Sequence, residues 1–136
     1  MIEVNAMFPV MVADNLEAIK EFYQGVFGFE VIFYDPNFYL HLVSSNNGIQ
    51  LGFLMPNHAS QPAFLHSIMS PDGFVISLEV KDATLAYAEA QKIALNFVIG
   101  LKEEEWGQVH FIIQDPAGFR IDVVQHLDPA HIISEE

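Results

Sequence analysis

An acidic residue lies in the middle of an apolar segment near the end of this 136-residue chain. Asp122 stands between Ile121 and Val123, a few residues after an Asp-Pro-Ala-Gly turn at residues 115–118. A carboxylate among apolar neighbours costs free energy unless it is hydrogen-bonded, solvated or matched by a positive charge. Asp122 is therefore a metal ligand, a binding group for some other ligand, or a carboxylate at a solvated edge of a sheet.

The composition argues against several other kinds of chemistry. The chain contains no cysteine, which rules out disulfides, thiolate metal sites and cysteine nucleophiles. It also lacks the Gly-x-Ser-x-Gly, His-Glu-x-x-His and glycine-rich phosphate-loop motifs of hydrolases, zinc peptidases and nucleotide-binding proteins. Five basic residues against eighteen acidic ones give a formal net charge of −13. That charge disfavours nucleic acids and anionic membranes as partners and favours cationic or neutral ligands.

The same features indicate one ordinary globular domain. Hydrophobic residues make up 51% of the chain, without an apolar run long enough to span a membrane. The first residues lack the basic region of a secretory signal. Together with the absence of cysteine, these observations lead us to expect a cytoplasmic protein.

The hydrophobic pattern repeats a strand–helix–three-strand plan twice. An amphipathic helix is predicted from Asp14-Asn15 to Gly28, and a second helix from Asp82 through Ala90. The predicted strands are Phe8–Val12, Phe29–Tyr34, Phe38–Val43 and Ile49–Leu54 in the first half, and Phe74–Val80, Leu95–Ile99, Gln108–Gln114 and Phe119–Gln125 in the second.

The segments outside these elements are predicted to be connections. Residues 56–73 carry three prolines and are expected to be a linker, and the Glu103-Glu104-Glu105 run is expected to be a solvated loop. The tail beyond His126, with Pro129, is expected to be peripheral. We expect a single domain over residues 1–136, built of units at about 6–55 and 74–126.

Two stretches of sequence carry a resemblance to a known family. They are ADNLEAIKEFYQGVFGFEV, which begins at Ala13, and WGQVHFIIQDPAGFRIDVV, which begins at Trp106. Together they resemble the vicinal oxygen chelate superfamily, which includes glyoxalase I, bleomycin-resistance proteins and ring-cleaving dioxygenases. The resemblance covers about residues 6–126 and implies an α+β fold. Two tandem βαβββ units would form a curled mixed sheet around a cleft, with the helices outside, and the chain would form a homodimer.

The resemblance also locates the positions that hold a divalent metal in metal-dependent members. One lies in the first strand and one in the last strand of each unit, and His, Glu or Gln occupies them. In this chain they fall on Met7 or Phe8, on Gln50, on Phe74 or Val75, and on Asp122. A metal with an open position needs about three protein ligands. Two of the four positions are apolar under either alignment, so we expect no metal and no cofactor.

Strand alternation identifies the other polar residues of the cleft. A two-residue turn between the third and fourth predicted strands puts His41 and Tyr39 on the face of Gln50, whereas a three-residue turn would reverse this. The resemblance puts His110 on the cleft face with Asp122, and Trp106 shares the parity of His110. The predicted ligand-binding residues are therefore Tyr39, His41, Gln50, Trp106, His110 and Asp122.

Two hypotheses about function remain. In the first, the protein is a metal-independent binding module of the bleomycin-resistance type that sequesters a hydrophobic or cationic small molecule. In the second, it is a lyase, isomerase or dioxygenase-like enzyme that has a rebuilt metal site or uses His110 and Asp122 as an acid–base pair. A single histidine on a strand is more often a hydrogen-bonded structural residue than a catalytic one.

Overall fold

The computed structural model describes residues 1–127, and the predicted peripheral tail from residue 128 onward, with Pro129, lies outside the described residues. The chain forms two compact units, Met1–Ser70 and a second that starts at Pro71. The first contains β1 (Val10–Val12), α1 (Leu16–Phe27), β2 (Glu30–Asp35), β3 (Tyr39–Val43), β4 (Gln50–Leu54) and a 3-10 helix (Ala63–Leu65). The second contains β5 (Val75–Glu79), α2 (Ala83–Ala90), β6 (Asn96–Glu104), β7 (Gln108–Gln114) and β8 (Arg120–His126).

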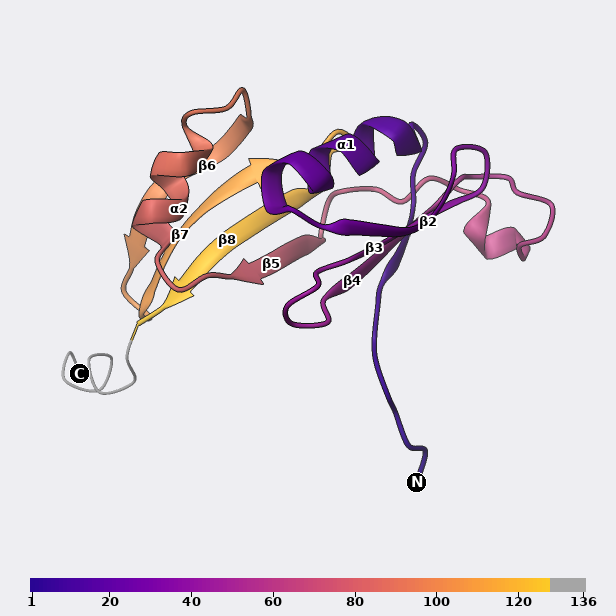
Figure 1. Ribbon diagram of the computed structural model, residues 1–136, viewed down its shortest axis with the longest axis horizontal. Helices are drawn as coiled ribbons and strands as arrows, with labels where there is room; N and C mark the ends of the chain where they lie inside the picture. Colours follow the sequence, from indigo (N-terminus) through magenta and orange to yellow (C-terminus); the bar gives the residue numbers. More distant parts are fainter. Residues whose placement is uncertain (128–136) are drawn as a thin grey trace. The chain divides into compact units, whose positions relative to one another are not determined.

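Each unit has one four-stranded mixed sheet with one helix against it (Figure 1). The strand order is β1-β4-β3-β2 in the first sheet and β5-β8-β7-β6 in the second. In both, the outer first strand runs parallel to the last strand, and the remaining pairs are antiparallel. The predicted α+β fold of two tandem βαβββ units is therefore confirmed. The described residues include no helix long and apolar enough to cross a membrane.

The amphipathic helix α1 covers one face of the first sheet. Leu16, Ile19 and Tyr23 are buried on its inner side, and the Tyr23 ring lies 5.5 Å from the ring of Phe53 in β4. Gly28 ends the helix as predicted, because its backbone has a φ of 69°, which glycine adopts without steric cost. This packing leaves the opposite face of the sheet to the alternate residues of β3 and β4.

The second unit repeats this arrangement with a shorter helix. Asp82 caps α2 by accepting a hydrogen bond from the backbone N–H of Leu85 at 3.0 Å. Tyr87 packs on Phe111 of β7 and on Phe97 of β6, at ring distances of 5.1 and 5.5 Å. The face of β7 and β8 opposite α2 is again available to other side chains.

Two predicted strand boundaries were wrong by more than one residue. The first strand begins at Val10 and not at Phe8, because Pro9 has no N–H to donate, although its carbonyl accepts a hydrogen bond from Gly52. The strand predicted to end at Ile99 continues as β6 to Glu104. The register of its pairing with β7 shifts twice, so β6 contains extra residues that have no partner in β7. Glu103 and Glu104 therefore belong to a strand and not to the solvated loop that the sequence suggested.

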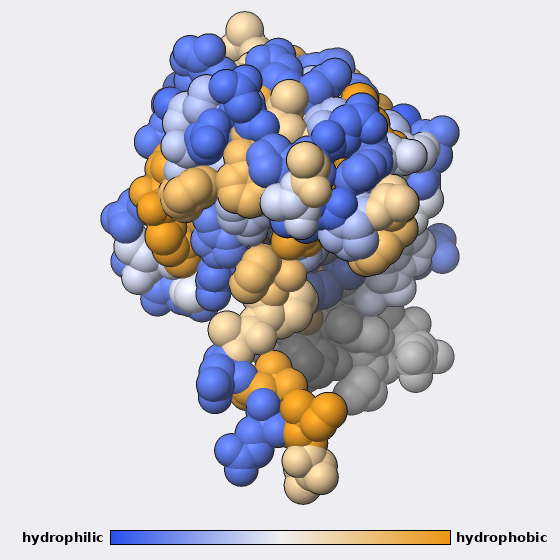
Figure 2. All heavy atoms as spheres, turned by 90° about the vertical axis from the view of Figure 1, so that its right-hand side faces the viewer, coloured by the Kyte–Doolittle hydropathy of each residue, from blue (hydrophilic) through white to orange (hydrophobic). Residues whose placement is uncertain are grey.

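The residues before β1 are extended and exposed. Ile2 is 89% and Val4 75% exposed, and Met7 is 76% exposed. Figure 2 shows hydrophobic side chains on this projecting N-terminal segment. Apolar residues exposed together in this way are typical of a contact surface.

Candidate functional site

In the first unit, a histidine is hydrogen-bonded to two polar side chains on the sheet face opposite α1. His41 in β3 pairs with Gly52 in β4, so its side chain shares a face with Gln50. The His41 Nε2 lies 2.7 Å from the Gln50 Oε1, and its Nδ1 lies 2.7 Å from the Tyr39 hydroxyl. The predicted placement of Tyr39, His41 and Gln50 on one face is therefore confirmed.

The partners of His41 determine where its proton lies. An amide oxygen only accepts, so the Nε2 of His41 donates to Gln50. The Nδ1 atom of the neutral ring then accepts from the hydroxyl of Tyr39. Burial raises the pKa of that hydroxyl above its ordinary value, so Tyr39 keeps its proton at neutral pH. With one proton on the His41 ring, these three residues form a directional series of hydrogen bonds from Tyr39 through His41 to Gln50.

Two neighbouring residues pack against these hydrogen-bonded side chains, and the sequence analysis assigned them no such role. The ring of Phe8 stands edge-on to the His41 ring, with 4.7 Å between centroids. The Tyr39 hydroxyl lies directly against Gly52. A Cβ at this position would overlap the hydroxyl, so only glycine leaves room for it. The signal in the sequence that could have identified this position was a glycine inside a predicted strand, which often marks the close approach of another group.

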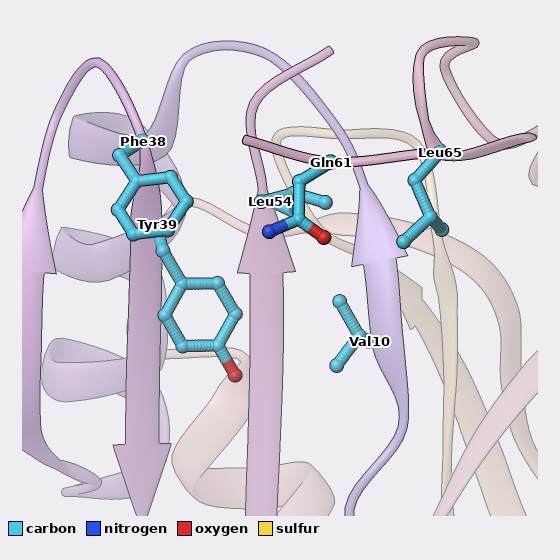
Figure 3. Close-up of a pocket in the computed structure, with 6 residues that line it drawn as sticks. All are labelled: Val10, Phe38, Tyr39, Leu54, Gln61 and Leu65. Atoms are coloured by element: carbon cyan, nitrogen blue, oxygen red, sulfur yellow. The ribbon is translucent and has the colours of Figure 1, made fainter. Parts of the chain in front are cut away.

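A pocket of about 320 Å³ adjoins Tyr39. Figure 3 shows its lining side chains converging on one space from β1, β3, β4 and the segment after β4. The lining residues are Val10, Phe38, Tyr39, Leu54, Gln61 and Leu65. Gln61 and Leu65 come from the segment that was predicted to be a linker. That segment belongs to the first compact unit, where Met69 N–H donates to the carbonyl of Val12 at 2.9 Å.

In the second unit, His110 lies between two carboxylates. Its Nδ1 is 2.7 Å from the Asp122 Oδ1, and its Nε2 is 2.9 Å from the Glu104 Oε2. The His110 side chain is 8% exposed, Glu104 12% and Asp122 17%. Lys102 completes the cluster by an ion pair of 3.2 Å with Glu104. The predicted proximity of His110 and Asp122 is confirmed, whereas Glu104 was missed.

The two carboxylates make His110 a cation. Burial alone favours the neutral ring, but the hydrogen bonds to Glu104 and Asp122 outweigh this and raise the pKa of His110 above its ordinary value. The hydrogen bond from His110, aided by Lys102, lowers the pKa of the Glu104 carboxyl. Ionised carboxylates only accept, so both ring nitrogens of His110 carry protons. Asp122 is thus a carboxylate matched by a positive charge.

His41 and His110 occupy equivalent positions in the two sheets. His41 lies opposite the residue two places after Gln50, and His110 lies opposite the residue two places after Asp122. Each histidine contacts the polar residue of the last strand of its own unit. Gln50 and Asp122 belong to different units, so the expectation that they lie side by side remains a prediction.

Trp106 does not join the His110 cluster. It lies in the turn between β6 and β7, where its ring is 62% exposed. The following Gly107 has a φ of 92°, which belongs to the tight turn that leads into β7. The indole N–H donates to the Gln108 Oε1 at 2.9 Å. Gln108 and His110 are two residues apart in β7 and share a face, so a role for Trp106 in ligand binding remains a prediction.

The side chains at the four positions expected to bind a divalent metal do not form a suitable set of ligands. At the first-strand position Phe8 covers His41, and in the second unit Phe74 packs on Phe119 at 5.6 Å. Val75, which pairs with Arg120, has only an aliphatic side chain. Within residues 1–127, no group of three His, Asp or Glu side chains is arranged to hold a metal ion.

Comparisons with known proteins identify relatives of this fold. A family model described as the Glyoxalase/Bleomycin resistance protein/Dioxygenase superfamily matches residues 7–123. No curated protein gives a significant match. Among solved structures, a superfamily member from Sphaerobacter thermophilus has 22% identity and a TM-score of 0.71, over 91% of this chain and 98% of its own.

Two further solved structures have different names. TioX from Micromonospora sp. ML1 is 14% identical with a TM-score of 0.71, over 91% of this chain and 100% of its own. A lactoylglutathione lyase from Agrobacterium tumefaciens is 19% identical with a TM-score of 0.70, over 90% of this chain and 94% of its own. At these identities the likeness shows a common fold and does not transfer a reaction.

Proposed function

Because this chain belongs to the glyoxalase/bleomycin resistance/dioxygenase superfamily, we propose that it is a metal-independent binding protein of the bleomycin-resistance type. Its ligand is a small hydrophobic molecule, which it sequesters in the pocket of the first unit. The observation that carries this proposal is the aromatic and aliphatic lining of that pocket. Concave, mostly apolar sites with a few polar groups are the usual form of small-molecule sites.

The lining supports a hydrophobic ligand more than a cationic one. None of the six described lining residues is charged. A buried cation needs a paired anion or an aromatic face to compensate for its lost hydration. The net charge of −13 attracts cations to the protein as a whole. The pocket lining contains no carboxylate, so only the rings of Phe38 and Tyr39 are available to compensate a cation there.

The two histidine clusters support binding more than acid–base catalysis. A catalytic imidazole must present one nitrogen to the substrate. In this protein both nitrogens of His110 contact carboxylates, and both nitrogens of His41 contact Gln50 and Tyr39. The enzymatic alternative that uses His110 and Asp122 therefore has no specific observation in its favour.

Titration with naphthalene, a neutral aromatic probe, tests the proposal by ligand-observed NMR in buffer that contains EDTA. We expect saturable binding, which Phe38→Ala weakens about tenfold, because about 1.4 kcal/mol of aromatic contact is lost. The matched control is Phe64→Ala, since Phe64 is 80% exposed and does not line the pocket. Absence of binding, or equal weakening by both substitutions, would contradict the proposal.

A further inference from the structure

The pocket beside Tyr39 contains two polar side chains in an otherwise hydrocarbon lining. They are the hydroxyl-bearing Tyr39 and the amide-bearing Gln61, whereas the other lining residues are aliphatic or phenylalanine. Figure 3 shows the Gln61 amide and the Tyr39 ring reaching toward the same space around Leu54. The hydrogen-bonding character of a ligand is therefore set by what these two groups offer.

Tyr39 offers an acceptor to the pocket. Its hydroxyl lies 2.7 Å from the His41 Nδ1, and the His41 Nε2 already donates to Gln50 over 2.7 Å. The hydroxyl proton is thus committed to His41, and a lone pair on the oxygen remains for a ligand. The hydrogen bonds of His41 and Gln50, which do not line the pocket, therefore determine whether Tyr39 offers the pocket a donor or an acceptor.

Gln61 offers both a donor and an acceptor. Its Nε2 donates to the Ser60 Oγ at 3.2 Å. That bond uses one of the two N–H groups, so the second N–H and the Oε1 atom are both available to a ligand. Tyr39 is therefore the polar side chain that restricts a ligand to donating.

From this arrangement we infer that the pocket selects uncharged, flat aromatic molecules that carry an N–H or O–H donor on their rim. The inference rests on the proposed function and specifies its ligand class. Phe38 and Tyr39 provide the aromatic contact, and the donor of the ligand satisfies the oxygen of Tyr39. A molecule of the same shape with an acceptor in that place leaves two oxygens facing each other, without a hydrogen bond.

Indole and benzofuran are suitable probes, because they have nearly the same shape and differ in an N–H against an oxygen. Isothermal titration calorimetry on the full chain measures both affinities. We expect indole to bind about two- to tenfold more tightly than benzofuran, which is the effect of one hydrogen bond. In Tyr39→Phe that ratio falls toward one while benzofuran binding is retained.

Controls separate this inference from the proposed function. Tyr34→Phe removes a hydroxyl from β2, outside the pocket lining, and the indole preference remains. Gln61→Leu provides a second test: the preference remains, because Gln61 can pair with a donor or with an acceptor and Tyr39 can only accept. If indole and benzofuran bind equally to the wild-type protein, the inference is overturned and the proposed function stands. If neither probe binds, both fail.

Discussion

Replacing Asp122 with asparagine removes one charge from the His110 cluster and leaves its shape nearly unchanged. Hydrogen bonds to a charged group stabilise a protein by about 1.5–3 kcal/mol, roughly twice the value of a neutral one. Asparagine keeps an oxygen that accepts from the His110 Nδ1, so about half of that stabilisation remains. We expect Asp122→Asn to lower the free energy of unfolding by about 0.8–1.5 kcal/mol near pH 6.

The loss depends on pH in a defined direction. The pKa of His110 is raised in the folded protein, so its ion pairs stabilise fully below the unfolded pKa of about 6.5. This stabilisation disappears as the pH rises through the folded pKa. Once His110 is neutral, the ion pair with Asp122 is lost and at most one N–H of the ring remains to donate to a carboxylate. The cost of Asp122→Asn is therefore largest near pH 6 and smaller in alkaline solution.

Urea denaturation at pH 6, 7.5 and 9 measures this effect, and NMR titration of the His110 ring measures its pKa directly. Asp72→Asn is the matched control, because Asp72 is 82% exposed and forms an ion pair with Arg120 in the same unit. We expect the control to change stability by no more than about 0.5 kcal/mol. Equal losses from Asp122→Asn at pH 6 and pH 9 would refute the ionic role of the cluster.

Three further outcomes follow from other parts of the molecule. Gly52→Ala displaces Tyr39 and destabilises the fold by about 1–3 kcal/mol in urea denaturation, whereas Gly25→Ala in α1, where the added Cβ meets nothing within 4 Å, has no such cost. The chain sediments as a homodimer, and deletion of exposed residues 1–7 shifts it toward monomer; a full-length monomer at high concentration would count against this. Protein purified without chelator contains far less than one metal ion per chain. If it instead contains near-stoichiometric nickel, zinc, iron or manganese, and Asp122→Ala abolishes this binding, the protein is not metal-independent.

The sequence was sufficient to predict the parts of the fold that depend on local patterns. Amphipathic spacing located α1, glycine marked its end, and the Asp82 cap marked the start of α2. Strand alternation with a short turn placed His41 beside Gln50. These predictions succeeded because the position of a side chain within a strand or helix is fixed by neighbours close in sequence.

The missed residues depend on contacts that local patterns do not encode. Glu104 reaches His110 because irregular pairing extends β6 beyond Gly100, and nothing in an acidic run indicates that its middle member is largely shielded from solvent. Gln61 and Leu65 line the pocket because a proline-bearing segment packs back on β1. Exposed loops and folded-back segments have similar compositions, so only the tertiary contacts distinguish them.

The two histidine clusters show how equivalent positions favour different numbers of ring protons. His41 faces an amide and a phenol, so one ring proton is enough for both of its hydrogen bonds, whereas His110 faces two carboxylates, which raise its pKa. Replacing Gln50 with glutamate should therefore add a proton to His41.

The added proton changes what the pocket offers. Once the His41 Nδ1 carries a proton, it donates to the Tyr39 oxygen, and the Tyr39 hydroxyl turns its own proton toward the ligand. We expect Gln50→Glu to abolish or reverse the preference for indole over benzofuran, and 15N NMR of the imidazole to show two protonated nitrogens at neutral pH. Gln108→Glu, on the other unit, is the matched control and should leave the preference unchanged. An unaltered preference in Gln50→Glu with a doubly protonated His41 would break the proposed link between the histidine and the pocket.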